Sequence, residues 1–257
     1  MIKELFEKQK PLMVAGVTSL ACFIVLAIIS QFDSTEILGI NRWIKPMKFF
    51  ISITIFVWTT AVYLNFLKSY AKSSQFISWG MILVFFIEMF IVVMQAARGT
   101  TSHFNIKNPF DAILFAIMGI SILFNTILAG YLLYLYFKAD IDLPKSIVWG
   151  MRLGLILFLL TSFEGGYMSA QLGHSVGVAD GGVGLPIVNW STKGGDLRAA
   201  HFFGMHAFQA VPIFAVVLEK FRVKYAVNLT FAFSLVYFAI FSFVFIQALL
   251  AKPLLFF

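Results

Sequence analysis

Residues 12–30, LMVAGVTSLACFIVLAIIS, contain no charged side chain and no proline. A helix rises ~1.5 Å per residue, so this run can cross the ~30 Å hydrocarbon core of a bilayer. It is longer than the apolar region of a secretory signal, and no small-x-small cleavage pattern follows it. We therefore expect a retained membrane-spanning helix at the start of the chain.

The whole chain shares this apolar character. Of its 257 residues, 60% are hydrophobic and 12% are charged, and 31 are phenylalanine. Soluble domains carry about 25% charged residues. This composition predicts an integral membrane protein with a single transmembrane domain over residues 1–257. Cys22 is the only cysteine, which excludes a disulfide within the chain.

Seven apolar runs are each long enough to span a bilayer. They cover residues 12–30, 48–67, 76–97, 110–137, 146–166, 199–218 and 226–251. Lipid offers the backbone no hydrogen-bond partners, and the runs lack the alternation of a membrane β-barrel. The predicted fold class is therefore all-α, a polytopic seven-transmembrane-helix bundle.

Lysine and arginine indicate the orientation, because they concentrate in cytoplasmic loops. The N-terminal segment and every second loop hold a modest excess of both residues. We expect a protein of the cell (inner or cytoplasmic) membrane with a cytoplasmic N-terminus and an extracytoplasmic C-terminus. The basic residues lie in short clusters between apolar runs, so membrane lipid is the expected partner and nucleic acid is not. The oligomeric state stays open.

Three short matches recur in the same order in both halves of the chain. SQFD (30–33) parallels TSFE (161–164), MKFF (47–50) parallels AHFF (200–203), and VVMQA (92–96) parallels VFIQA (244–248). They suggest two parallel three-helix repeats, spans 1–3 and 5–7, joined by span 4. Each match is short, so the internal repeat is a hypothesis.

Polar residues gather on the predicted outer side. The 167–198 segment is rich in glycine but also holds Val, Leu, Pro and Trp, unlike a flexible linker, and we expect it to form a folded extracytoplasmic cap. It leads into GGDLRAAHFFGMHAFQ (194–209), where Arg198, His201, His206 and Gln209 fit one broad face of a helix. Ionisable groups at that depth should face the bundle interior.

These residues predict an outward-facing polar pocket roofed by the cap. Glu164 and His206 are the candidate catalytic groups. The predicted metal ligands are His174, Asp180, Asp196, His201 and His206, and the predicted ligand-binding residues are Glu88, Gln95, Arg98, His103, Arg198 and Gln209.

Several functions fit such a pocket. The preferred hypothesis is a site for a metal ion or small polar ligand, with zinc-dependent hydrolysis as its chemistry, because imidazoles and carboxylates suit a divalent ion such as zinc. One alternative is a small-solute or proton-coupled transporter with Glu88 and His206 as titrating groups. A second is a haem-binding redox protein ligated through His201 or His206. A purely structural role is the remaining alternative: Glu88 would pair with His206 to fix helix packing.

Overall fold

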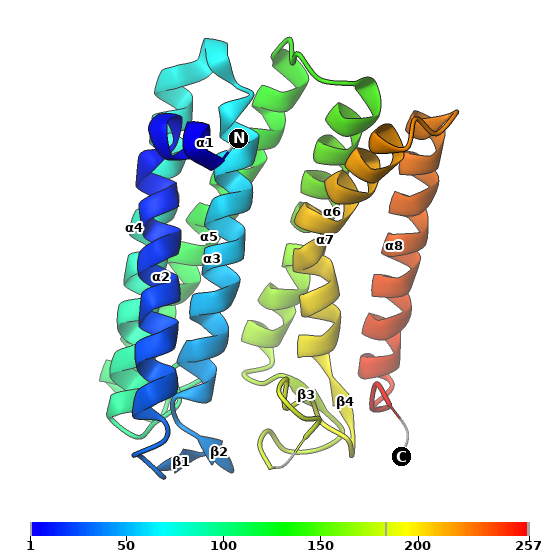
Figure 1. Cartoon of the computed structure of the whole chain (residues 1–257). Coiled ribbons are helices and arrows are strands. Elements are labelled where there is room, and N and C mark those ends of the chain that lie inside the picture. Colours follow the sequence, from blue (N-terminus) through cyan, green and yellow to red (C-terminus); the bar gives the residue numbers. More distant parts are fainter. Residues whose placement is uncertain (1, 183, 256–257) are drawn as a thin grey trace. The chain divides into compact units, whose positions relative to one another are not determined.

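The structure, a computed structural model, describes residues 2–182 and 184–255. Seven of its helices are long and apolar enough to cross a membrane, which confirms the predicted number of long apolar helices. The α-helices are α1 (Ile2–Lys8), α2 (Lys10–Ile29), α3 (Ile44–Asn65), α4 (Ala71–Ala97), α5 (Pro109–Lys138), α6 (Lys145–Ala170), α7 (Leu197–Lys220) and α8 (Ala226–Leu249), and a 3₁₀ turn η1 (Lys68–Tyr70) precedes α4 (Figure 1).

Two small antiparallel hairpins were not anticipated from the sequence. The strands β1 (Glu36–Ile37) and β2 (Ile40–Asn41) pair between α2 and α3, and the strands β3 (Ser175–Val176) and β4 (Gly195–Asp196) pair between α6 and α7. Helix α6 also continues to Ala170, so the segment expected to start at residue 167 begins after one more helical turn.

The chain forms two compact units, which meet in sequence within α5, after Leu135. The first contains α1 to α4 and most of α5, and the second contains the end of α5 and α6 to α8. Each unit contains the series helix, two antiparallel strands, helix, helix, which is α2–β1–β2–α3–α4 in the first and α6–β3–β4–α7–α8 in the second (Figure 1). This shared order is compatible with the internal repeat, which stays a prediction.

In the first unit, α2 and α3 pack closely because a glycine faces a tryptophan. A side chain at Gly16 would overlap the Trp58 indole, whose Nε1 donates to the Met13 carbonyl at 3.2 Å. Thr54 also donates to the Gly16 carbonyl at 3.2 Å. Such small-residue contacts are a common way for membrane helices to associate.

The β1–β2 hairpin is fixed by one carboxylate. Asp33 accepts hydrogen bonds from Thr35 N (3.0 Å), Arg42 Nε (2.6 Å) and Trp43 Nε1 (2.8 Å). These bonds, from Thr35 first and then from Trp43 and Arg42, hold the pKa of the Asp33 carboxyl below its usual range. Asp33 thereby joins the end of α2 to the start of α3.

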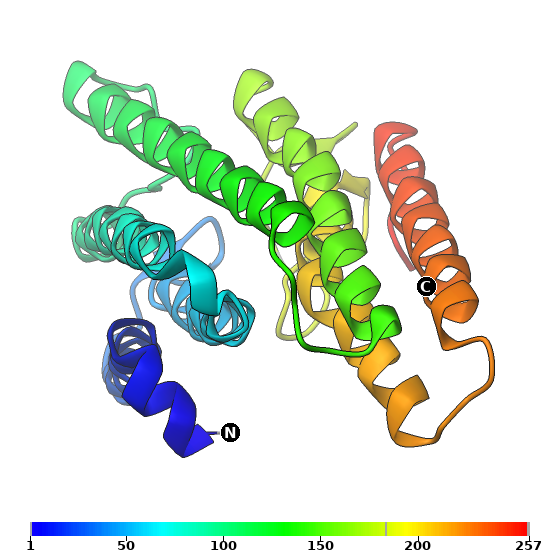
Figure 2. The ribbon, with the colours of Figure 1, turned by 90° about the horizontal axis from the view of Figure 1, so that it is seen from above.

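In the second unit, α7 lies beside α6 and α8 (Figure 2). Small residues again mark the α6–α7 contact, since Gly150 faces Ala215 and Gly204 faces Thr161. Pro212 lies inside α7, where it removes a backbone hydrogen bond, and α7 changes direction along its length (Figure 1). The contact brings the end of α6 against the start of α7.

Candidate functional site

The second unit holds a buried carboxylate paired with an imidazole. Glu164, near the end of α6, and His201, in the second turn of α7, are joined by a 2.9 Å contact between Oε2 and Nδ1. Gly165 allows this approach, because a side chain there would press on the His201 ring. The predicted site residues Glu164 and His201 therefore lie together.

The two members of this pair differ in exposure. The Glu164 side chain is 2% exposed, whereas the His201 side chain is 37% exposed. Among the described residues, Glu164 Oε1 has no hydrogen-bond partner. The imidazole thus lies between the surface and a buried carboxylate whose other oxygen, Oε1, has no hydrogen-bond partner in the described part of the chain.

The first unit contains a second pair of the same kind. Glu88 Oε1 in α4 lies 3.4 Å from His103 Nε2, and the side chains are 3% and 23% exposed respectively. Glu88 Oε2 is buried and has no hydrogen-bond partner in the described part of the chain. Within its unit, the imidazole beside Glu88 is that of His103.

His103 reaches Glu88 because the loop after α4 turns back into the unit. Glu88 lies about 13 Å before the end of α4, at ~1.5 Å per residue. The His103 ring contacts Phe49 of α3 and Phe115 of α5, with ring centroids 5.5 and 6.4 Å away. Asn105 in the same loop is also buried, 1% exposed. Irregular backbone is tolerated at such depth where protein surrounds it.

Gln95 and Arg98 belong to a network that closes this loop. Asp111, at the start of α5, accepts from Gln95 Nε2 at 2.8 Å and from Arg98 Nη1 at 2.7 Å. Asn108 donates to the other Asp111 oxygen at 2.7 Å. These predicted ligand-binding residues therefore tie α4 to α5, and Asp111, outside the predicted set, is their common acceptor.

Asp196 begins α7 as a helix cap. It accepts from the Arg198 backbone N–H at 3.0 Å and from the Ser191 N–H at 2.8 Å. The Arg198 guanidinium also binds both of its carboxylate oxygens, at 2.9 and 2.6 Å. Asp196 is 3% exposed, so a buried charge is fully paired here.

Asp180 folds the loop between α6 and α7. Its carboxylate accepts from the backbone N–H groups of His174 and Ser175, the latter at 2.8 Å. His174 Nδ1 lies 3.4 Å from Asp180 and 3.7 Å from Asp196. The predicted metal ligands Asp180 and His174 therefore contact one another within this loop.

His206 and Gln209 lie one to two turns further along α7 than His201. The His206 ring packs against Phe202, with ring centroids 4.4 Å apart, and interacts with Gln209 one turn further along. Within the described residues, the hydrogen-bonding partner of Glu164 is His201. Glu88 belongs to the other unit, so the predicted convergence of Glu88 with His206 stays a prediction.

The described residues hold no group of three His, Cys, Asp or Glu side chains arranged for a metal ion. Catalytic zinc sites use three protein ligands and structural sites use four. The predicted ligands are instead divided between the Glu164–His201 pair, the Asp180–His174–Asp196 contacts, and His206. The binding of zinc and the binding of haem both stay predictions.

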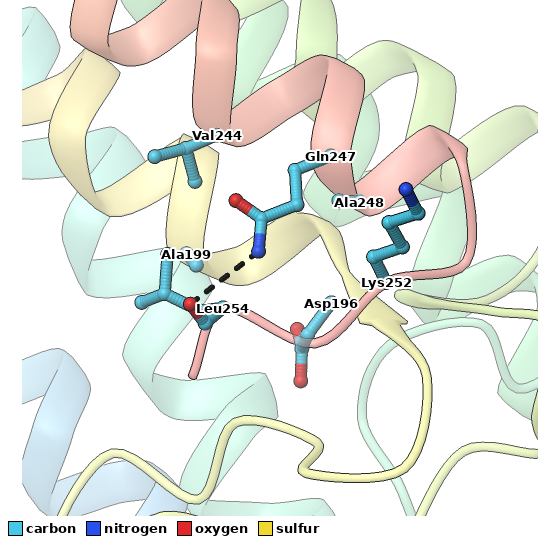
Figure 3. A pocket seen from close by; sticks show the side chains of 7 residues that line it. All are labelled: Asp196, Ala199, Val244, Gln247, Ala248, Lys252 and Leu254. Atoms are coloured by element: carbon cyan, nitrogen blue, oxygen red, sulfur yellow. Dashed lines mark hydrogen bonds between the residues drawn. The ribbon is translucent and has the colours of Figure 1, made fainter. Parts of the chain in front are cut away.

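A crevice lies beside the start of α7 and the end of α8 (Figure 3). It is lined by Asp196, Ala199, Val244, Gln247, Ala248, Lys252 and Leu254 and leaves essentially no space that a water molecule could occupy. Gln247 donates across it to the carbonyls of Pro253 and Leu254. Small-molecule pockets usually measure ~300 Å³ or more, so this crevice is too small for most ligands.

No protein-family model, curated protein or solved structure matched this chain when it was compared with them. The sequence identified the acids and histidines of both pairs but not the pairing. The polar run around His103 gives no sign in sequence that it turns inward.

Proposed function

We propose that this chain is a proton-coupled membrane transporter of small solutes. Its proton-exchanging groups are the two carboxylate–imidazole pairs, Glu88–His103 and Glu164–His201. One observation carries the proposal: in each unit, a buried carboxylate has one oxygen beside a partly exposed imidazole and another with no hydrogen-bond partner.

A buried carboxylate with an unsatisfied oxygen is expensive to keep ionised. Taking up a proton removes the charge without any movement of the backbone. Imidazole is suited to deliver that proton, because it gains and loses protons near neutral pH through either ring nitrogen. In each pair, a proton would pass from water to the histidine and from the histidine to the glutamate, and would return by the same route.

The number of groups that could ligate a metal ion favours proton binding over metal binding at each pair. Each pair offers one carboxylate and one imidazole, and the other acids near the second pair are already engaged. Asp196 is bound by Arg198, and Asp180 by the backbone of its own loop. A zinc-dependent hydrolase would need at least one further protein ligand at either pair.

Both glutamates lie in the second half of their helices, and chain alternation would assign the ends of these two helices to one side of a membrane. Glu88 and Glu164 precede the ends of α4 and α6, which run in the same sense if every long helix crosses the bilayer. With a cytoplasmic N-terminus, that side is extracytoplasmic. The pairs would then exchange protons with the outer aqueous phase.

The test is the transient current that follows an acid pH jump on proteoliposomes adsorbed to a sensor. Proton binding below the surface displaces charge even when no solute is present. We expect a transient in the wild type that is reduced in Glu88→Gln and in Glu164→Gln. Glu36→Gln, which removes an exposed acid of the β1 strand, is the matched control and should leave the transient unchanged. Equal transients in all four proteins would refute the proposal.

A further inference from the structure

Arg152 is a cation within a membrane-spanning helix and is used by neither pair. It lies two turns after the start of α6, about 10 Å along the helix axis. Its Nε and Nη2 donate to the Tyr136 carbonyl, at 3.0 and 2.8 Å. Tyr136 lies in the last turn of α5, where carbonyls lack helical partners, so Arg152 caps that helix.

Two aromatic rings fix the plane of the guanidinium. Its carbon lies 4.8 Å from the Phe137 ring centre and 5.1 Å from that of Trp149. Helical side chains lean toward the N-terminus of their helix, which carries this guanidinium toward the turn between α5 and α6. The cation is thereby held at one end of the span.

The charge of Arg152 has no acidic counterpart in the part of the chain that the structure describes. None of the ion pairs there includes it, and its Nη1 makes no hydrogen bond. The other arginines that form ion pairs, Arg42, Arg98 and Arg198, each bind an aspartate. An unpaired cation inside a membrane segment is costly, so a partner from outside the chain is expected.

We propose that Arg152 binds the phosphate of an anionic lipid headgroup. The Nη1 side of the planar guanidinium presents N–H donors at fixed positions. This geometry suits the oxygens of a phosphate. Lys138 and Lys145, both exposed, flank the same turn, and the exposed Asp140 and Asp142 between them balance their charge, so Arg152 is the source of net positive charge here. A lipid is the source we commit to, because bilayer phosphates lie at the ends of spans and basic sites between helices recognise anionic headgroups.

The test measures retention of dioleoyl phosphatidylglycerol by the detergent-purified full chain, using native mass spectrometry with phosphatidylcholine as the reference lipid. We expect the wild type to prefer the anionic lipid, and Arg152→Gln and Arg152→Lys to bind it about fivefold more weakly or worse. The Gln variant keeps a hydrogen-bond donor for the Tyr136 carbonyl. The Lys variant keeps the positive charge but loses the planar guanidinium. Lys72→Gln, which removes an exposed cation at the start of α4, should bind as the wild type does.

Two results would overturn this proposal. The first is equal retention of phosphatidylglycerol by the wild type and by both Arg152 variants. The second is displacement of the lipid by equimolar inorganic phosphate, which would assign the site to free phosphate. Unfolding midpoints without lipid serve as the folding control, and if Arg152→Gln does not fold, the Arg152→Lys comparison alone decides. The proton-exchange proposal is unaffected by either outcome.

Discussion

At the residue scale, the Glu164–His201 contact should contribute measurably to stability. Removing the imidazole in His201→Leu leaves a buried carboxylate without a partner, a change that usually costs about 1–3 kcal/mol. Replacing both residues in Glu164→Leu/His201→Leu removes the unsatisfied group as well. We therefore expect the double variant to be more stable than His201→Leu, as measured by thermal unfolding in detergent.

His206→Leu is the control for this comparison. Its neighbours on α7 are Phe202 and Gln209, so its loss leaves no carboxylate without a partner. We expect it to unfold at a higher temperature than His201→Leu. A double variant that is no more stable than His201→Leu would show that the two side chains are not energetically coupled.

The hydrogen bonds that Asp33 accepts predict that the folded chain loses stability at acid pH. Its pKa is lower in the folded chain than the ~3.9 of an unfolded aspartate, because Thr35, Trp43 and Arg42 donate to the ionised form. Between these two pKa values the unfolded chain binds more protons, so stability rises with pH. The contribution of Asp33 is complete above about pH 5 and is lost as the pH falls through its folded pKa.

The measurement is the unfolding midpoint of the wild type and of Asp33→Asn from pH 7 to pH 3. We expect the wild type to be the more stable at pH 7 and the difference to shrink below pH 4. Asp140→Asn, which changes an exposed acid, should follow the wild type throughout. A constant difference between wild type and Asp33→Asn would contradict the assignment.

At the element scale, the contact between β4 and α8 leaves no room for a side chain. A Cβ at Gly195 would overlap the carbonyl of Ala248, which is backbone and cannot turn aside. Gly195→Ala should therefore lower the unfolding midpoint and disturb the adjacent Asp196 cap. Gly119→Ala in α5 is the matched control, because nothing lies within 4 Å of its Cβ. There the substitution should be neutral or stabilising by up to ~1 kcal/mol, the gain in helix propensity.

The elements also show what the sequence could predict. The long helices followed from hydropathy and length, because every backbone group in lipid must be satisfied within its own segment. The hairpins could not be predicted, since two-residue strands such as Glu36–Ile37 have no periodicity. The Asp196 cap was predictable because it depends on neighbours in sequence. The Glu88–His103 contact was not, because it depends on a loop returning into its unit.

At the scale of the whole molecule, the seven helices that are long and apolar enough to cross a membrane would place alternate loops on opposite sides of it. Cys22→Ala removes the only cysteine and allows single cysteines to report on this topology. We expect Glu36→Cys to react with an impermeant maleimide added to intact cells. Lys72→Cys should react only after the membrane is opened. The reverse pattern would invert the orientation, and labelling of both from one side would contradict the number of spans between them.

The most direct test of proton exchange is an infrared difference titration of the purified chain. Protonated carboxylic acids in an apolar site give a carbonyl band distinct from that of the carboxylate. As the pH is lowered, we expect this band to grow in the wild type, to lose part of its intensity in Glu88→Gln and in Glu164→Gln, and to lose both parts in the double variant. A band that is the same in the wild type and the double variant would show that neither glutamate takes up a proton, and would contradict the account.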